Sequence, residues 1–153
     1  MVKEALYCAL YLIAISVIIF LLGRVFPKKW VKPKSFPFKS FAFEKEGKIY
    51  EKIGIRKWKT KWPDASLLLH KIMPKRLPKK RLDGDKKEKA VILLKESCLA
   101  ESVHALAIIA GLFSLKICKN WLGILLNAIY TFINIPPILI QRYNRPRLQR
   151  LAA

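Results

Sequence analysis

The stretch that decides the fold is residues 5 to 26, "ALYCALYLIAISVIIFLLGRVF". It holds about 20 consecutive apolar or small residues before Arg24, and at about 1.5 Å per residue such a helix spans a hydrocarbon core of roughly 30 Å. A cleaved signal peptide would have a shorter apolar region and a cleavage site of small residues. Here the basic sequence "PKKWVKPK" follows instead. We therefore predict an uncleaved transmembrane helix.

Two further apolar stretches, residues 98–115 and 121–140, are long enough to make two more spans. A short basic turn separates them. The first of the two is expected to begin outside the membrane, as one long helix over residues 86–115 that Asp83 or Asp85 could cap. Whether a fourth, re-entrant membrane segment exists stays an open question.

The rest of the chain is strongly basic. The formal net charge is +20 while 53% of the 153 residues are hydrophobic, a combination that is unusual for one soluble domain. Residues 27–95 hold 22 Lys or Arg against 7 Asp or Glu, and residues 141–153 hold four Arg and no acid. By the positive-inside rule, both stretches are expected to be cytoplasmic. We predict an all-α, multi-pass cell-membrane protein, a single domain over residues 1–153 with about three transmembrane helices, a basic interfacial segment over 27–85 and a basic tail over 141–153.

Within the basic segment, "PKSFPFKSFAF" (residues 33–43) is typical of an extended chain whose aromatic rings lie among the lipid headgroups. Residues 44–62 can form short surface helices interrupted at Gly54, and the prolines and glycine of residues 73–87 predict a loop. Most of the charge needs no further role than attraction to anionic lipid. Nucleic-acid binding is not expected, because no recognition motif accompanies the charge.

Polar side chains interrupt the second and third spans, and they are Glu101, His104, Asn127 and Asn134. A membrane-buried charge costs about 2.5 kcal/mol or more unless it faces protein or water. Glu101 and His104 are three residues apart and hence neighbours on one helix face, with Glu96 in the same half of the span. The motif "QRYNRPR", residues 141–147, ends the third span on the same side of the membrane. We expect carboxylates, an imidazole and arginines to converge at that rim.

This set of groups suits group transfer. A histidine beside a carboxylate is a general-base pair, and arginines hold phosphates by forked hydrogen bonds. The alternative is structural: Glu101 and His104 could only bond across helices, the arginines could only contact lipid phosphate, and Asn134 could only satisfy carbonyls freed by Pro136 and Pro137. Spacing alone leaves both interpretations open.

Several familiar site types are missing from the sequence. Two histidines and no cysteine pair at ligand spacing argue against zinc. Cys8, Cys98 and Cys118 lie in or beside apolar spans, where they behave as small hydrophobes. There is no nucleophile elbow, phosphate-binding loop or dinucleotide fingerprint. We therefore expect no metal and no bound cofactor.

Three blocks of the chain carry a family resemblance: residues 38–64, 96–104 and 134–148. They resemble the small membrane acyltransferases of carotenoid biosynthesis, the glycosyl-4,4'-diaponeurosporenoate acyltransferase family of the staphyloxanthin pathway. The likeness covers most of the chain from Phe38 onward, and the separations of Glu96, Glu101 and His104 match. It implies transfer of a fatty acyl chain onto the sugar of a glycosylated C30 carotenoid acid. Little likeness exists from about residue 65 to 90, which leaves the acceptor open.

The resemblance selects among the candidate residues, since His70 lies outside its motifs. The expected catalytic residues are Asp64, Glu96, Glu101 and His104. The expected substrate-binding residues are Asn134, Gln141, Arg142, Tyr143, Asn144, Arg145 and Arg147, with Arg56 and Lys57 from the basic segment.

Chemistry assigns a role to each group of residues. We predict that His104, oriented by Glu101, is the general base. Arg142, Arg145 and Arg147, together with Arg56 and Lys57, are expected to hold the donor's phosphates. Tyr143 or Asn144 is expected to donate a hydrogen bond to the oxyanion.

The partners expected are a lipid acceptor, an acyl-CoA or acyl-carrier thioester as co-substrate, and a membrane with anionic lipid. A homo-oligomer would enlarge the small cavity that three spans can enclose. Two other functions stay open. One is a non-catalytic membrane scaffold or lipid-binding subunit, and the other is a small membrane reductase or isomerase acting on a polyprenyl lipid.

Overall fold

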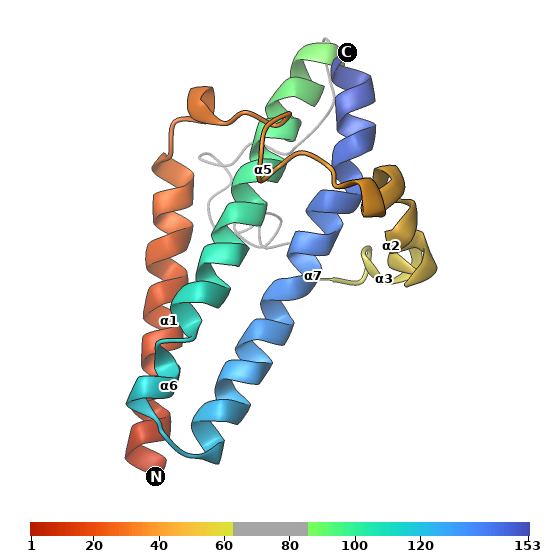
Figure 1. Ribbon diagram of the computed structural model, residues 1–153. Coiled ribbons are helices and arrows are strands. Elements are labelled where there is room, and N and C mark those ends of the chain that lie inside the picture. Colours follow the sequence, from red (N-terminus) through yellow and green to blue (C-terminus); the bar gives the residue numbers. More distant parts are fainter. Residues whose placement is uncertain (63–85) are drawn as a thin grey trace.

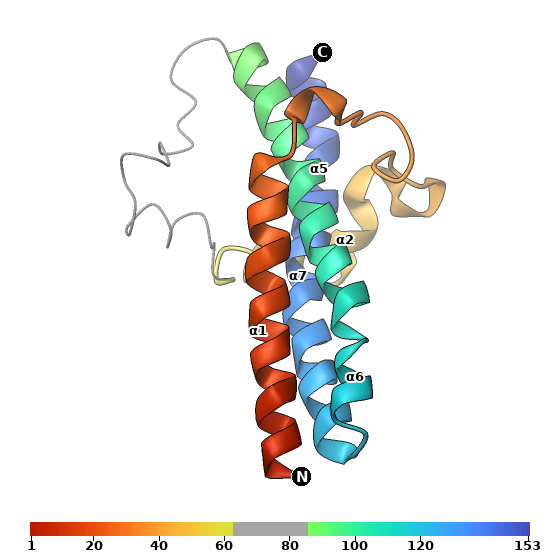
Figure 2. The ribbon, with the colours of Figure 1, turned by 90° about the vertical axis from the view of Figure 1, so that its left-hand side faces the viewer.

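The computed structural model describes residues 1–62 and 86–153, and three long helices dominate these ranges. They are α1 (Val2–Val25), α5 (Lys86–Gly111) and α7 (Trp121–Ala152). Figures 1 and 2 show them side by side, with the N-terminus at one end of the bundle and the C-terminus at the other. Each belongs to a helical stretch that is long and apolar enough to cross a membrane, which confirms the predicted all-α fold with three spans.

The helix α1 exposes most of its apolar side chains, as expected of a helix that faces lipid, and buries a narrow stripe that includes Cys8 and Leu12. Its polar groups are paired. The Tyr11 hydroxyl donates to the carbonyl of Ala110 at 2.9 Å, and Ser16 Oγ lies 2.8 Å from the Tyr130 hydroxyl. These bonds tie α1 to both other helices, because hydrocarbon offers polar groups no other partner.

The helix α5 ends at Gly111, four residues before the predicted end at 115, and a short helix α6 (Ser114–Ile117) follows. Asn127 of α7 stabilises this break. Its amide nitrogen donates to the Gly111 carbonyl at 2.7 Å and to Ser114 Oγ at 3.2 Å. One polar residue of the third span is thereby explained by structure alone. The predicted caps Asp83 and Asp85 lie outside the described residues.

The helix α7 packs antiparallel against α5 and makes its most extensive contact there. Asn120 caps its first turn, with Oδ1 accepting the Leu122 N–H at 3.0 Å. The helix continues to Ala152 through Pro136, Pro137 and Pro146, so the basic tail predicted over residues 141–153 is helical and continuous with the third span. A proline removes one backbone hydrogen bond, but the side chains beyond residue 140 gain partners on other elements that hold the helix in place.

Short helical segments flank the bundle: η1 (Lys28–Trp30), η2 (Ala42–Gly47), α2 (Lys48–Lys52) and α3 (Ile55–Trp58). Figure 1 shows η2, α2 and α3 beside the C-terminal half of α7. The predicted break at Gly54 is confirmed, and its φ of +69° is one that glycine adopts without a steric penalty. Tyr50 and Ile55 are buried against Tyr143 of α7.

Residues 33–43 are folded differently from the prediction. Turns replace the extended chain over residues 33–39, and η2 begins at Ala42. The carbonyls of Pro37 and Phe38 accept hydrogen bonds from two arginines of α7, at 2.9 and 3.0 Å. The segment is therefore attached to the bundle through its backbone, while Phe36 and Phe43 remain exposed.

Candidate functional site

Four charged side chains meet where α5, α7 and η2 come together, and we call them the ion-pair cluster: Glu44, Glu101, Arg142 and Arg145. One carboxylate oxygen of Glu101 accepts from Arg142 Nε at 2.8 Å, and the other pairs with Arg145. Arg142 also donates to Glu44 at 2.6 Å. The Arg145 side chain is 1% exposed and that of Glu101 is 9% exposed, so the cluster is buried. Two cations balance two anions within it.

Glu44 is held by its own surroundings. It accepts hydrogen bonds from the Tyr50 hydroxyl and, at 2.8 Å, from the Phe41 N–H. Burial acts to raise the pKa of Glu44, but the hydrogen bonds from Tyr50, Arg142 and Phe41 outweigh it and keep the pKa below its ordinary value. Burial, with the adjacent Glu44 carboxylate, raises the pKa of Tyr50. Glu44 is thus ionised at neutral pH.

The ion-pair cluster corrects two predictions. Glu101 is engaged by the arginines of α7 and does not orient His104. Arg142 and Arg145 bind carboxylates and backbone carbonyls, which leaves them unsuited to hold the phosphates of a donor. The physical reason is burial. A buried guanidinium without a counterion is strongly destabilising, so these two side chains stay paired with carboxylates.

His104 has a different partner. Its Nδ1 lies 2.8 Å from Oδ1 of Asn134, and the amide nitrogen of Asn134 donates to the Tyr130 carbonyl at 2.9 Å. Because that nitrogen is already used as a donor, Oδ1 is the acceptor and Nδ1 of the imidazole carries the proton. In the neutral imidazole, Nε2 then keeps its lone pair. Asn134 therefore fixes the tautomer, a role that we predicted for Glu101.

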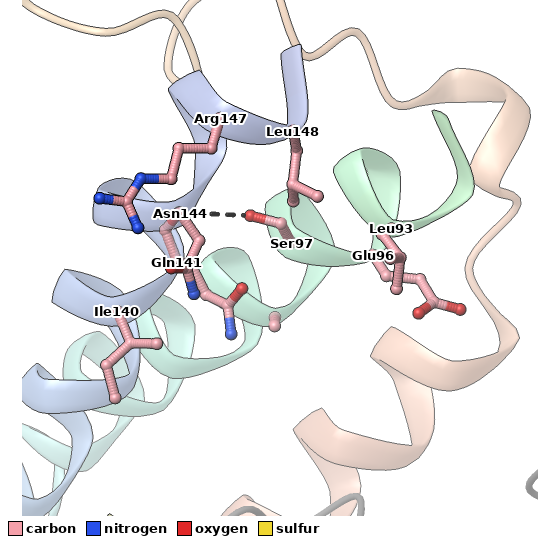
Figure 3. Close-up of a pocket in the computed structure, with 9 residues that line it drawn as sticks. Leu93, Glu96, Ser97, Ile140, Gln141, Asn144, Arg147 and Leu148 are labelled. Carbon is pink, nitrogen blue, oxygen red and sulfur yellow. Dashed lines mark hydrogen bonds between the residues drawn. The ribbon is translucent and has the colours of Figure 1, made fainter. Parts of the chain in front are cut away.

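A pocket of about 350 Å³ lies between α5 and α7, and we call it the α5–α7 pocket (Figure 3). Its polar lining comes from Glu96, Ser97, Gln141, Asn144 and Arg147. Its apolar lining comes from Leu93, Ala100, Ile140 and Leu148. Glu96 forms an ion pair with Lys28 at 2.7 Å. The pocket brings together three predicted site residues of α7 and one of α5.

A second pocket of about 220 Å³ lies between α7 and the flanking helices, and we call it the basic pocket. Its lining has four cations, two carboxylates and a phenol: Lys48, Arg56, Arg147, Arg150, Glu46, Glu51 and Tyr143. The Tyr143 hydroxyl accepts from Arg56 Nε at 3.2 Å and from Arg147 at 2.7 Å. A hydrogen bond from Arg56 keeps the pKa of Glu51 below its ordinary value. Arg147 lines both pockets.

The remaining predicted residues are less well placed. Tyr143 is nine residues from Asn134 along α7, about 14 Å at the rise of a helix, so Tyr143 and His104 do not converge on one reacting atom. Lys57 is exposed on α3 and lines neither pocket. Asp64 and His70 lie outside the described residues. Sequence reasoning missed Glu44, although an acid in so basic a segment was a signal that it has a buried partner.

The fold and these pockets define a small helical membrane protein with polar pockets at one end of its bundle. A family model described as glycosyl-4,4'-diaponeurosporenoate acyltransferase matches residues 27–153. The chain is 36% identical to the protein of that name from Staphylococcus aureus strain N315, over 98% of this chain and 88% of that protein. The corresponding protein of strain MRSA252 is 35% identical over the same shares. No solved structure matches.

The chain therefore belongs to the glycosyl-4,4'-diaponeurosporenoate acyltransferase family and is an acyltransferase. This confirms the resemblance found in the three sequence blocks. It also favours acyl transfer over the scaffold and reductase alternatives. An acyltransferase requires an acyl donor and, in this family, a lipid acceptor.

Proposed function

We propose that the chain transfers a fatty acyl group from a thioester donor to a sugar hydroxyl of a glycosylated carotenoid or related glycolipid, with His104 as the general base. The observation that carries this proposal is the bond from His104 to Asn134, which leaves Nε2 able to accept a proton. A neutral imidazole inside a bundle is suited to deprotonate a hydroxyl.

The position of His104 relative to the α5–α7 pocket supports this role. Ala100 lines the pocket, and His104 lies four residues further along the same face of α5, about 6 Å along the helix axis. His104 does not itself line the pocket, so the reacting hydroxyl would project from the inner end of the pocket toward the imidazole. As the imidazole takes the proton, the sugar oxygen attacks the thioester carbonyl. The C–S bond then breaks, the thiolate takes the proton from the imidazolium, and an ester and a free thiol result.

The basic pocket is suited to the phosphates of the donor. Its cations outnumber its carboxylates, and Arg56 and Arg147 are exposed. Arg147 is thirteen residues from Asn134, about 20 Å along α7. A thioester on a long pantetheine arm, as in coenzyme A or a carrier protein, suits that separation. In this scheme Arg56 and Arg147 keep the predicted role that Arg142 and Arg145 lose.

We also propose that the basic segment and the C-terminal end of α7 face the cytoplasm, close to anionic lipid, and that two copies associate. The bias of Lys and Arg toward these segments supports the orientation. Cysteine placed at Ala153 should be inaccessible to an impermeant maleimide on intact cells, whereas cysteine placed at Val2 should react. The reverse result would invert the orientation.

The test of the reaction is mass spectrometry of the glycolipid made by cells that supply the acceptor. Cells with the wild-type chain should accumulate a product heavier by one fatty acyl group, and His104→Ala should lower its rate of formation by about 10²-fold or more. His70→Ala is the matched control, because it removes the only other histidine. Retained turnover in His104→Ala would exclude His104 as the base. An unchanged glycolipid pool in wild-type cells would refute acyl transfer to a sugar.

A further inference from the structure

We infer that the α5–α7 pocket binds the sugar of the acceptor and that Gln141 and Asn144 recognise its hydroxyl groups. This inference rests on the proposed function and assigns a site to one of its two substrates. The two pockets differ in chemistry. The basic pocket presents mainly cations, whereas the α5–α7 pocket mixes amides, a serine and a carboxylate with one arginine. Sugar hydroxyls both donate and accept hydrogen bonds, so they match the mixed lining.

The amides of the pocket have hydrogen-bonding capacity to spare. Within the part of the chain that the structure describes, the half-buried side chain of Gln141 makes no hydrogen bond. Asn144 accepts from Lys59 Nζ at 3.2 Å through Oδ1, which leaves its amide nitrogen as a donor. Figure 3 shows Gln141 reaching from α7 toward α5, close to Ser97. Ser97 Oγ donates to the backbone carbonyl of Gln141 at 3.5 Å, a long contact that a ligand could replace.

The apolar part of the lining fits the rest of an amphiphilic acceptor. Ile140 is the last residue of the apolar stretch of α7, and exposed isoleucines such as Ile133 and Ile135 precede it. A sugar in the pocket would therefore leave its attached apolar chain beside the lipid-facing surface of α7. The volume of about 350 Å³ lies at the small end of the range for ligand pockets, which suits one sugar rather than a whole lipid.

Helix geometry sets which side of the pocket is open. At about 100° per residue, Asn144 points about 60° to one side of Gln141, while Arg145 points about 40° to the other. The ion-pair cluster therefore closes one side of the contact between α5 and α7, and the pocket occupies the other. His104 lies about one turn from Ala100 on α5, and Asn134 lies about two turns from Gln141 on α7, on nearly the same face as Gln141. A sugar bound in the α5–α7 pocket would direct a hydroxyl toward His104.

A binding experiment tests this assignment without turnover. The protein carrying His104→Ala is placed in nanodiscs and titrated with glycosyl-4,4'-diaponeurosporenoate and with the sugar-free 4,4'-diaponeurosporenoate, and tryptophan quenching reports binding. We expect the glycosylated pigment to bind about tenfold more tightly or better. Gln141→Ala and Asn144→Ala should each weaken its binding by about threefold to tenfold, the usual effect of losing one hydrogen bond. Neither should change binding of the sugar-free pigment.

Two further variants keep the result interpretable. Gln149→Ala makes the same chemical change on the same helix but outside the lining of either pocket, so it should leave binding unchanged. Ala100→Leu should fill the pocket and reduce binding of the glycosylated pigment while helicity by circular dichroism stays at the wild-type level. Equal affinity for both pigments, or a sugar preference that survives Gln141→Ala, Asn144→Ala and Ala100→Leu, would overturn the inference.

A third ligand separates failure of this inference from failure of the proposed function. Diglucosyl diacylglycerol carries a sugar on a different lipid. Binding of this glycolipid through Gln141 and Asn144, without binding of the pigment, would support the sugar site and refute the proposed acceptor. A different pair of results would refute the site and leave the proposed function standing. In that case the wild-type protein acylates the pigment, and the preference for the glycosylated pigment survives all three pocket substitutions.

Discussion

Replacing Glu101 by Gln should destabilise the protein more than any exposed charge substitution. The change leaves two arginines without their shared counterion, and one of them, Arg145, has a side chain only 1% exposed. Removing one partner of a buried ion pair costs about 3 to 5 kcal/mol. At about 2 to 4 °C per kcal/mol for a chain of this size, the midpoint of thermal unfolding should fall by about 6 to 20 °C.

The assay is thermal unfolding in detergent, followed by circular dichroism. Glu46→Gln is the matched control, because Glu46 pairs with Arg150 at 3.3 Å and their side chains are 73% and 65% exposed. An exposed pair contributes about 0 to 1 kcal/mol, so this variant should differ little from wild type. The double variant Glu101→Leu, Arg145→Met should regain part of the loss, since it leaves only Arg142, which retains Glu44. Equal losses for Glu101→Gln and Glu46→Gln would refute the view that burial gives the cluster its importance.

Three other outcomes follow from the site. The pKa of Glu44 is lower in the folded state, so the folded state binds that proton less readily than the unfolded state. The free energy of unfolding should therefore hold above the ordinary pKa of 4.5 and decline as the pH falls below it. The decline should be smaller in Glu44→Gln. Asn134→Leu should lower kcat about tenfold and alter the pH dependence of kcat, because His104 loses the bond that fixes its tautomer, and an unaltered profile would contradict that role. Arg56→Ala should raise the KM for the thioester by about tenfold with little change in kcat, whereas Lys57→Ala should change neither.

The sequence predicts the helices of this protein better than it predicts their partners. Apolar length alone identifies the three spans, and Gly54 marks a real break between α2 and α3. The continuation of α7 beyond residue 140 was missed because a run of arginines and prolines is typical of a helix end. Only the carboxylates of Glu44 and Glu101, which come from distant parts of the chain, explain why Arg142 and Arg145 can be buried in this helix.

The candidate site shows the same limit. The spacing correctly places Glu101 and His104 on one face of α5. Which residues of α7 they contact depends on the register of the two helices, and the spacing does not give that register. The antiparallel register of α5 and α7 sets His104 opposite Asn134 and Ser97 opposite Gln141. No local pattern contains this register. Glu101 consequently meets arginines, and an amide takes the place expected for a carboxylate.

The unbroken course of α7 should make the protein sensitive to the thickness of its bilayer. Its 32 residues measure about 48 Å, whereas a hydrocarbon core of roughly 30 Å accommodates about 20 of them. Asn134, which contacts the imidazole of His104, and the α7 residues that line the two pockets therefore lie at different heights along one continuous helix. Lipids with longer acyl chains would submerge the region around Gln141, and shorter ones would lift Asn134 toward the headgroups. Turnover should be compared across phosphatidylcholines of increasing chain length. It should pass through a maximum at the bilayer thickness that places Asn134 and the two pockets at their working depths.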